Sequence, residues 1–283
     1  MIFRKFGWTE QRVSLIGQGT WMMEGDPDHE RRAIETLRLG IDLGMTHIDT
    51  AEMYGNGRVE ELVSEAISGR RNEVFLASKV LPSNASFEGT QRACVRSLKR
   101  LRTDRLDLYM LHWLGEHPIR ETMRAMEKLV REGLIRFIGV SNLDVEELSA
   151  AENALRNERL ASDQVLYNLE ERGIERRLLP YCERREMALV AYSPFGHGKF
   201  PSSRSVEGRV LALIAERHGR SPRQVALNFL ARHPGVFAIP KAGRPEHAIE
   251  NAGSVGWDLT DEDIAMIERA FPVPDHDVPL AVL

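Results

Sequence analysis

MTHIDTAEMY, residues 45–54, is the stretch around which the rest of the chain is organised. It follows Gly44 and starts as an apolar run that ends in a carboxylate, Asp49, and a phenol, Tyr54, comes five residues later. A carboxylate at the end of a buried strand needs a reason, because an ionised group is costly to remove from water. Taken alone, the stretch is better explained by a polar strand end that faces solvent and a packed tyrosine.

The same pattern recurs along the chain: an apolar run of about five residues, a polar residue at its end, a loop, and a segment with helical periodicity. Strands that alternate with helices indicate parallel pairing with right-handed crossovers. Eight such units predict a (β/α)8 barrel, although doubly wound sheets share the alternation. Strands are expected at residues 13–16, 45–49, 74–78, 106–111, 135–140, 163–166, 188–191 and 236–239.

Helix boundaries follow from capping signals. Asp144 is placed to cap the fifth helix, Ser221 precedes Pro222, Pro245 starts another helix, and Thr260 opens the last one. Residues 2–14 are expected to form a short hairpin ahead of the barrel. No shift in composition divides the chain, so we expect one domain over residues 1–283, with extra helices near the C-terminus.

Composition indicates a soluble globular protein, with 42% hydrophobic and 28% charged residues. The net charge of −4 gives no reason to expect a nucleic-acid partner. No apolar run approaches the roughly 20 residues that span a bilayer, so a cytoplasmic protein without a membrane partner is expected. Cys94 and Cys182 fall within expected helices without metal-like spacing, which predicts packed thiols and no metal site.

Active sites of (β/α)8 barrels are built at the carboxyl ends of the strands. A single polar residue there is ordinary, but an aspartate, a tyrosine, a lysine and a histidine in consecutive units predict an active site. The residues at or just beyond the expected strand ends are Trp21, Asp49, Tyr54, Lys79, His112, Ser141, Asn142, Gln164, Tyr192 and Lys241.

The chemistry of four of these residues fits one task. Tyr54 can serve as a general acid if its pKa is brought down from about 10, and a nearby ammonium such as that of Lys79 favours the phenolate. Asp49 would keep Lys79 charged and oriented, and His112 would orient a substrate oxygen beside the phenol. Such a group protonates an oxygen that gains charge when a hydride attacks a carbonyl. No side chain donates a hydride, so a nicotinamide cofactor is implied, although no GxGxxG follows any strand.

At these motifs the sequence resembles the aldo-keto reductase superfamily along nearly its whole length. The motifs are GTW (19–21), HIDTAEMYGNGRVEELV (47–63), ASK (77–79), LDLYMLHW (106–113), GVSN (139–142), AYSPF (191–195) and IPKAGRPEHAIEN (239–251). The resemblance implies a (β/α)8 barrel that binds NADPH without a Rossmann motif and reduces aldehydes or ketones to alcohols. It also implies the catalytic tetrad Asp49, Tyr54, Lys79 and His112, with Tyr54 as the acid.

The resemblance further implies binding residues. Cofactor contacts are expected from Thr20, Trp21, Asp49, Ser141, Asn142, Gln164, Tyr192, Ser193, Phe195, Lys241, Arg244, His247, Glu250 and Asn251. Within this set, Ser141, Asn142 and Gln164 match residues that hold the nicotinamide carboxamide, and Tyr192 matches the aromatic under the ring. Substrate contacts are expected from Trp21, Tyr54, His112 and Trp113.

One departure concerns the cofactor phosphate. Many members carry an arginine where this chain has His247, and a serine where it has Ala242. A histidine with an ordinary pKa near 6.5 is mostly neutral at pH 7 and attracts a phosphate less. Arg244 can compensate if it points inward. We therefore expect NADPH to be preferred less steeply than usual, with NADH possible.

The C-terminal tail and the loop after residue 195 give expectations about the size of the substrate and about a possible lid. The short tail after Phe271 suggests an open mouth, and Trp21, Met22, Trp113 and Phe195 suit a small, fairly apolar carbonyl compound. Within the superfamily the chain most resembles the compact bacterial reductases, and this resemblance implies methylglyoxal, glyoxals and simple aldehydes as substrates. Residues 197–205 are expected to form either a lid over the cofactor or a mobile loop.

Two other functions are compatible with a barrel. A member of this superfamily can serve as a cofactor-binding, non-catalytic partner subunit, but all four catalytic residue types are present here. A hydrolase or isomerase barrel calls for paired carboxylates or a metal cluster at the strand ends, and the sequence has neither. A monomer or weak homo-oligomer is expected.

Overall fold

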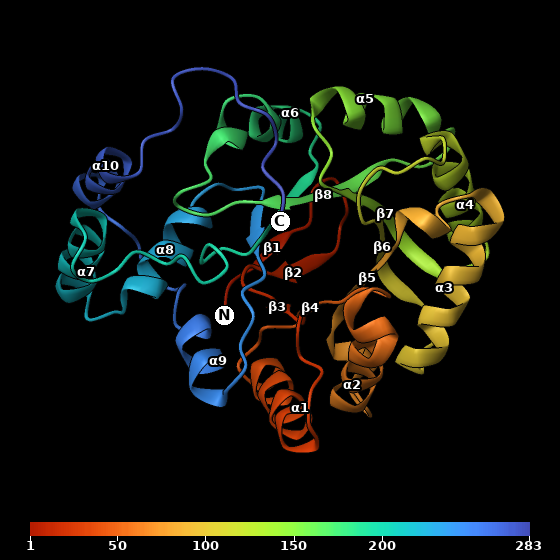
Figure 1. Cartoon of the computed structure of the whole chain (residues 1–283), viewed down its shortest axis with the longest axis horizontal. Helices are drawn as coiled ribbons and strands as arrows, with labels where there is room; N and C mark the ends of the chain where they lie inside the picture. The colour runs from red at the N-terminus through yellow and green to blue at the C-terminus, as the bar shows by residue number, and fades with distance from the viewer.

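Eight parallel strands form the centre of the molecule, in a computed structural model that describes residues 1–283. Each strand pairs with its neighbours in chain order, and helices surround the sheet (Figure 1). The strands are β3 (Gln18–Gly19), β4 (His47–Asp49), β5 (Phe75–Val80), β6 (Leu106–Leu111), β7 (Ile135–Ser141), β8 (Leu160–Leu166), β9 (Ala188–Tyr192) and β10 (Val236–Ala238).

The sheet closes on itself between its first and last strands. The Gly17 amide donates to the Ala238 carbonyl at 2.8 Å, the Ala238 amide to the Leu15 carbonyl at 3.1 Å, and the Gly19 amide to the Pro240 carbonyl at 3.2 Å. Closure leaves no unpaired sheet edge. The predicted (β/α)8 barrel is confirmed, and the doubly wound alternative is excluded.

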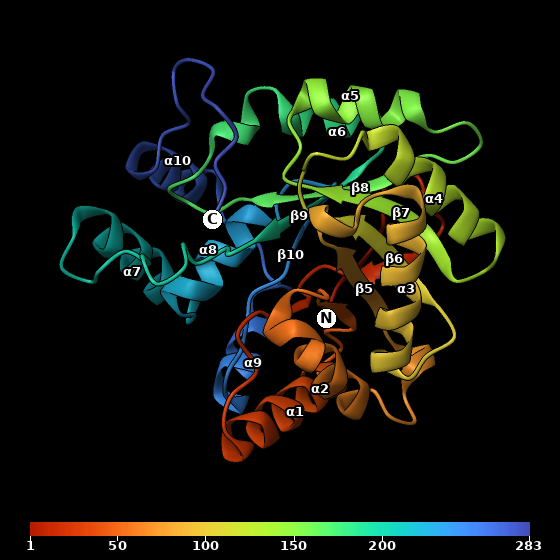
Figure 2. The ribbon, with the colours of Figure 1, turned by 45° about the vertical axis from the view of Figure 1, so that its right-hand side comes forward.

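Helices follow the strands and pack against the outside of the barrel (Figure 2). Their bounds are α1 (Pro27–Asp42), α2 (Arg58–Ala66), α3 (Phe87–Leu101), α4 (Ile119–Arg131), α5 (Val145–Ala154), α6 (Leu178–Arg184), α7 (Val206–His218), α8 (Pro222–Leu230), α9 (Pro245–Ala252) and α10 (Asp261–Ala270). Short 3-10 turns lie at η1 (Tyr54–Gly57), η2 (Arg71–Glu73), η3 (Pro82–Asn84) and η4 (Gly173–Glu175). None of the helices is long and apolar enough to cross a membrane.

Capping explains why several helices begin where they do. Asp144, Ser221 and Thr260 each cap a helix through a full capping box, as the sequence predicts. Helices α7 and α10 supplement the eight-unit barrel, so extra helices near the C-terminus are present as predicted. The position of α7 is a correction, because no helix is predicted from the sequence at Val206–His218.

A two-stranded hairpin precedes the barrel, as predicted: β1 (Phe3–Lys5) pairs antiparallel with β2 (Arg12–Ser14). Beyond β1, Phe6 is completely buried, and its ring centroid lies 5.0 Å from those of both Phe75 and Phe237. The ring of His47, at the start of β4, lies 6.0 Å from Phe6. The hairpin thus seals the end of the barrel where the strands begin, and leaves the opposite end free for a site.

Most strand residues are buried, because one face of each strand fills the barrel and the other packs under helices. Strand β5 extends two residues further than predicted, so Lys79 lies within the strand and not beyond its end. Cys94 in α3 and Cys182 in α6 are buried free thiols, in agreement with the predicted packing role.

Candidate active site

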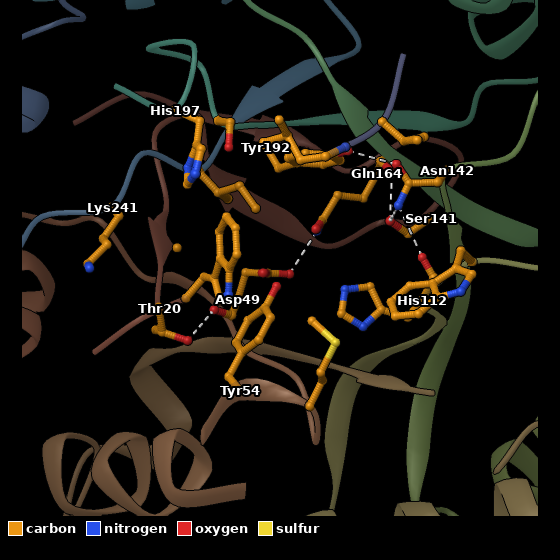
Figure 3. A pocket seen from close by; sticks show the side chains of 18 of the residues that line it. Thr20, Asp49, Tyr54, His112, Ser141, Asn142, Gln164, Tyr192, His197 and Lys241 are labelled. Carbon is orange, nitrogen blue, oxygen red and sulfur yellow. Dashed lines mark hydrogen bonds between the residues drawn. The ribbon is translucent and has the colours of Figure 1, made fainter. Parts of the chain in front are cut away.

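A cavity of about 940 Å³ opens at the carboxyl ends of the strands (Figure 3). Its walls come from β8, from the loops after β3, β4, β6, β7, β9 and β10, and from the C-terminal tail. The residues singled out from the sequence that line it are Thr20, Trp21, Met22, Asp49, Tyr54, His112, Trp113, Ser141, Asn142, Gln164, Tyr192, Ser193, Phe195 and Lys241. The fold therefore brings polar residues that follow strands throughout the chain together at one end of the barrel.

Lys79 lies behind the cavity wall and is completely buried. Its ammonium donates to Asp49 Oδ2 at 2.6 Å, to the Thr50 carbonyl at 3.0 Å and to the Tyr54 hydroxyl at 3.3 Å. Asp49 ends β4 and Lys79 lies in the neighbouring β5, so strand pairing holds the two side chains in the barrel interior. The geometry joins a buried ion pair to a phenol that faces the cavity.

Lys79 keeps its positive charge although it is completely buried. Burial by itself lowers the pKa of the lysine, but the adjacent Asp49 and the Tyr54 hydroxyl together raise it above its ordinary value. The lysine therefore stays protonated at neutral pH.

The pKa of Tyr54 differs from the expectation drawn from the sequence. Burial raises this pKa and outweighs the lowering effect of Lys79, while Asp49 raises it further. The predicted lowering of the Tyr54 pKa is wrong for the protein alone, because the desolvation of a nearly buried phenol exceeds the effect of one ammonium whose charge Asp49 offsets. The phenol is consequently protonated at neutral pH, which is the state that a proton donor needs.

His112 forms the wall beside Tyr54, and their ring centroids are 5.8 Å apart in an edge-to-face arrangement. Burial, aided by Lys79, lowers the pKa of His112 to about 2, so the imidazole is neutral. Its Nδ1 atom is buried without a hydrogen-bond partner. A neutral imidazole next to a phenol can orient an oxygen atom without competing as a proton source.

A chain of amide and hydroxyl groups continues from Asp49 across the cavity floor (Figure 3). Gln164 donates to Asp49 Oδ1 at 2.7 Å, and Asn142 donates to Ser141 Oγ at 3.1 Å and to the His112 carbonyl at 3.2 Å. The Tyr192 hydroxyl donates to Asn142 Oδ1 at 2.9 Å. This network fixes two primary amides near the acid group, where they can recognise a planar amide ligand.

The mouth of the cavity is bridged by two aromatic rings. The Trp21 indole and the His197 imidazole stack with centroids 5.0 Å apart and an interplanar angle of 19°. His197 and the flanking Gly196 and Gly198 all have positive φ, so the segment turns sharply at this point. The start of the segment 197–205 thus lies on the cavity, while its role as a lid stays a prediction.

Four predicted cofactor residues do not line this cavity. Arg244 immediately precedes α9 and His247 lies in its first turn, and both side chains are exposed. Glu250 accepts a hydrogen bond from Ser221 Oγ at 2.5 Å, and Asn251 is buried. Their contacts with a cofactor remain predictions, and they concern the region around α9 outside this cavity.

Several lining residues are not predicted from the sequence: Met53, Leu114, Glu147, Ile239, Val282 and Leu283. Leu114 directly follows the LDLYMLHW motif, and Glu147 lies three residues after Asp144, the predicted cap of the fifth helix, so both could have been found from the sequence. The tail carries no such signal. It returns to the barrel mouth, where the Leu283 amide donates to the Tyr192 hydroxyl at 3.4 Å, so the expected open mouth is narrowed by the tail.

Comparisons with known proteins agree with this arrangement. The model of the Aldo/keto reductase family matches residues 15–271. The chain is 44% identical over 264 residues to the methylglyoxal reductase YeaE of Escherichia coli, covering 93% of each chain, and 34% identical over 267 residues to a glyoxal reductase of Bacillus subtilis, covering 92% of each. A crystal structure of an aldo-keto reductase from Klebsiella pneumoniae in complex with NADPH superposes with a TM-score of 0.93 at 42% identity, over 100% of both chains. The chain therefore belongs to the aldo/keto reductase family of oxidoreductases.

Proposed function

We propose that this protein reduces small aldehydes and ketones such as methylglyoxal to alcohols, with NADPH as the hydride donor. The observation that carries the proposal is the buried Asp49–Lys79 pair in contact with the Tyr54 hydroxyl at the wall of the cavity. Similarity to a methylglyoxal reductase, to a glyoxal reductase and to an NADPH complex supports it.

In this proposal Tyr54 is the general acid. NADPH supplies the hydride to the carbonyl carbon. The phenolic proton of Tyr54 passes to the carbonyl oxygen as that oxygen gains negative charge. Lys79 stabilises the phenolate that remains, and Asp49 holds Lys79 in place. Neutral His112 orients the substrate oxygen beside the phenol.

The residues on the cavity floor fit a nicotinamide. We propose that Ser141, Asn142 and Gln164 hold its carboxamide and that the Tyr192 ring lies against its face. These groups already form one hydrogen-bonded network, so little reordering is needed on binding.

Lys241, Arg244 and His247 would hold the adenosine phosphate beyond the mouth. Because His247 replaces a permanently charged arginine, we expect His247→Arg to increase the affinity for NADPH at least about 5-fold and to leave the affinity for NADH nearly unchanged. Titrations of both cofactors against the parent and the variant measure this. A parent that prefers NADH would contradict the proposed NADPH preference.

The substrate end suits a small carbonyl compound. Trp21 and Trp113 line it, and the tail residues Val282 and Leu283 restrict it further. Turnover confined to bulky steroid or sugar substrates would contradict this size limit. We also propose a cytoplasmic monomer or weak homo-oligomer; the two free buried thiols suit a reducing compartment.

The function is tested by following the loss of NADPH absorbance with methylglyoxal and a panel of small aldehydes. We expect turnover with several of them. NADPH binding without turnover of any carbonyl compound would instead support a non-catalytic, cofactor-binding partner subunit.

A further inference from the structure

Charged side chains are few on the cavity wall. The acidic and basic residues among those that line it are Asp49, Glu147 and Lys241. Asp49 is neutralised by Lys79, and the Lys241 ammonium donates to the Met22 carbonyl at 2.7 Å, on the side of α9. Glu147 is therefore the one acidic side chain on the wall that no lysine or arginine pairs with.

Glu147 is held in place by the start of α5. Its Oε2 accepts a hydrogen bond from the Asp144 amide at 2.8 Å, and its own amide donates to Asp144 Oδ1 at 2.9 Å. This capping box fixes the side chain at the third position of the helix. The α5 helix begins three residues after Asn142. The Asn142 side chain forms hydrogen bonds with the His112 carbonyl and the Tyr192 hydroxyl. The position of the Glu147 carboxylate is therefore fixed relative to the part of the cavity wall that contains His112.

The surroundings of Glu147 add further negative charge. A neighbouring hollow of about 340 Å³ is lined by Asp144, Glu146, Glu171 and Asp277, with Arg177 as its only basic residue. Arg177 is paired with both Glu146 and Asp277, and Arg176 is paired with Asp277 as well. Neither arginine forms a salt bridge with Glu147.

We propose that Glu147 is a specificity-determining residue that disfavours carbonyl substrates carrying a carboxylate and so selects neutral ones. Two like charges within one partly enclosed cavity repel each other more strongly than in water, because the effective dielectric constant is lower there. A repulsive group of this kind discriminates against one substrate class at no cost to the other. The inference rests on the proposed reductase function.

The test compares butanal with 4-oxobutanoate, which differs in replacing a terminal methyl group by a carboxylate. For the parent we expect a much lower kcat/KM with 4-oxobutanoate. In Glu147→Gln this kcat/KM should rise on the order of 10-fold, while that for butanal stays within about 2-fold. Glutamine keeps the capping box, so the helix start is preserved.

Glu146→Gln is the matched control, because Glu146 lies one residue away and is paired with Arg177 outside the cavity wall. It should leave the ratio of the two kcat/KM values unchanged. The preference of the parent should also weaken at high salt, and that of Glu147→Gln should not. An unchanged ratio in Glu147→Gln would overturn the inference.

A binding readout separates this inference from the proposed function. Trp21 and Trp113 line the cavity, so their fluorescence reports ligands there. Benzoate should bind the parent more weakly than benzyl alcohol, which has no charge and no amide, and Glu147→Gln should narrow that difference. Failure to reduce butanal would count against the reductase function alone, whereas equal binding of benzoate and benzyl alcohol by the parent would count against the role of Glu147 alone.

Discussion

Lys79 is an unusual residue for a protein interior, since lysine is rarely buried without solvent contact. It is completely buried, and its three donated hydrogen bonds go to a carboxylate, a carbonyl and a phenol. Removing such a pair from water has a large free-energy cost that attraction between the charges offsets only in part. A buried pair retained next to a phenol is best explained by the chemistry of that phenol.

Asp49→Asn tests the pair directly. The substitution leaves the Lys79 ammonium buried without a counter-charge, so the free energy of unfolding should fall by roughly 3–5 kcal/mol. Urea denaturation of the parent and the variant measures this change. Arg31→Gln is the control: Arg31 pairs with Asp28 on the surface, with side chains 63% and 69% exposed, and its loss should have no measurable effect. Equal stability of Asp49→Asn and the parent would contradict the account of the pair.

At the scale of elements, the first and last strands must approach closely to close the barrel. A Cβ atom added at Gly19 would lie 2.6 Å from the Ile239 carbonyl oxygen. Because that oxygen belongs to the backbone, the strands themselves would have to separate. Gly19 also precedes Thr20, whose hydroxyl donates to the Asp49 carbonyl at 2.8 Å. Closure of the barrel and position of the site are thus linked.

We therefore expect Gly19→Ala to lower the free energy of unfolding by about 1–3 kcal/mol and to weaken NADPH binding as well. Thermal or urea unfolding and a cofactor titration measure the two effects. Gly235→Ala is the matched control, since its nearest neighbour would be the Met187 carbonyl at an ordinary 3.8 Å. Comparable losses in both variants would show that the close approach at Gly19 is not the cause.

Elements with strong local signals were predictable from the sequence, and others were not. The capping residues Asp144, Ser221 and Thr260 act through neighbours three residues away, so their helices could be located without the fold. Helix α7 was not predicted because its apolar residues are not confined to one face: Leu211 and Ile214 are buried, but Val206 and Leu213 are exposed. Its hydrophobic periodicity is accordingly weak.

At the scale of the whole molecule, the site depends on contacts between distant parts of the chain. Gln164 and Asp49, 115 residues apart, meet because parallel strands bring their carboxyl ends together. That rule made the cavity floor predictable. It could not place Val282 and Leu283, because a tail without periodicity is positioned only by the surface it meets. Nor could it foresee the raised pKa of Tyr54, which depends on burial.

A histidine at the opposite end of the barrel, His47, makes the free energy of unfolding depend on pH. His47 is completely buried with both ring nitrogens unpaired, and burial lowers its pKa to about 4. In the unfolded chain its pKa is near 6.5, so between these values the unfolded state binds a proton that the folded state does not. Stability should therefore fall as pH falls from about 6.5 to 4, with His47 contributing roughly 2–3 kcal/mol of the loss.

Urea denaturation at a series of pH values tests this expectation, with His47→Leu beside the parent. The variant should show a shallower loss of stability over the same pH range, since it has no imidazole to protonate at this position. If the free energy of unfolding fell equally with pH in both proteins, titratable groups other than His47 would account for the loss of stability in acid.

The central claim is that Tyr54 donates the proton to the substrate oxygen, and the most direct measurement compares Tyr54→Phe with the parent. Phenylalanine keeps the ring and its packing and removes only the hydroxyl that Lys79 contacts at 3.3 Å. Both proteins should bind NADPH with similar affinity. With methylglyoxal, kcat should fall at least about 100-fold in the variant. A variant that reduces methylglyoxal at nearly the rate of the parent would contradict the account.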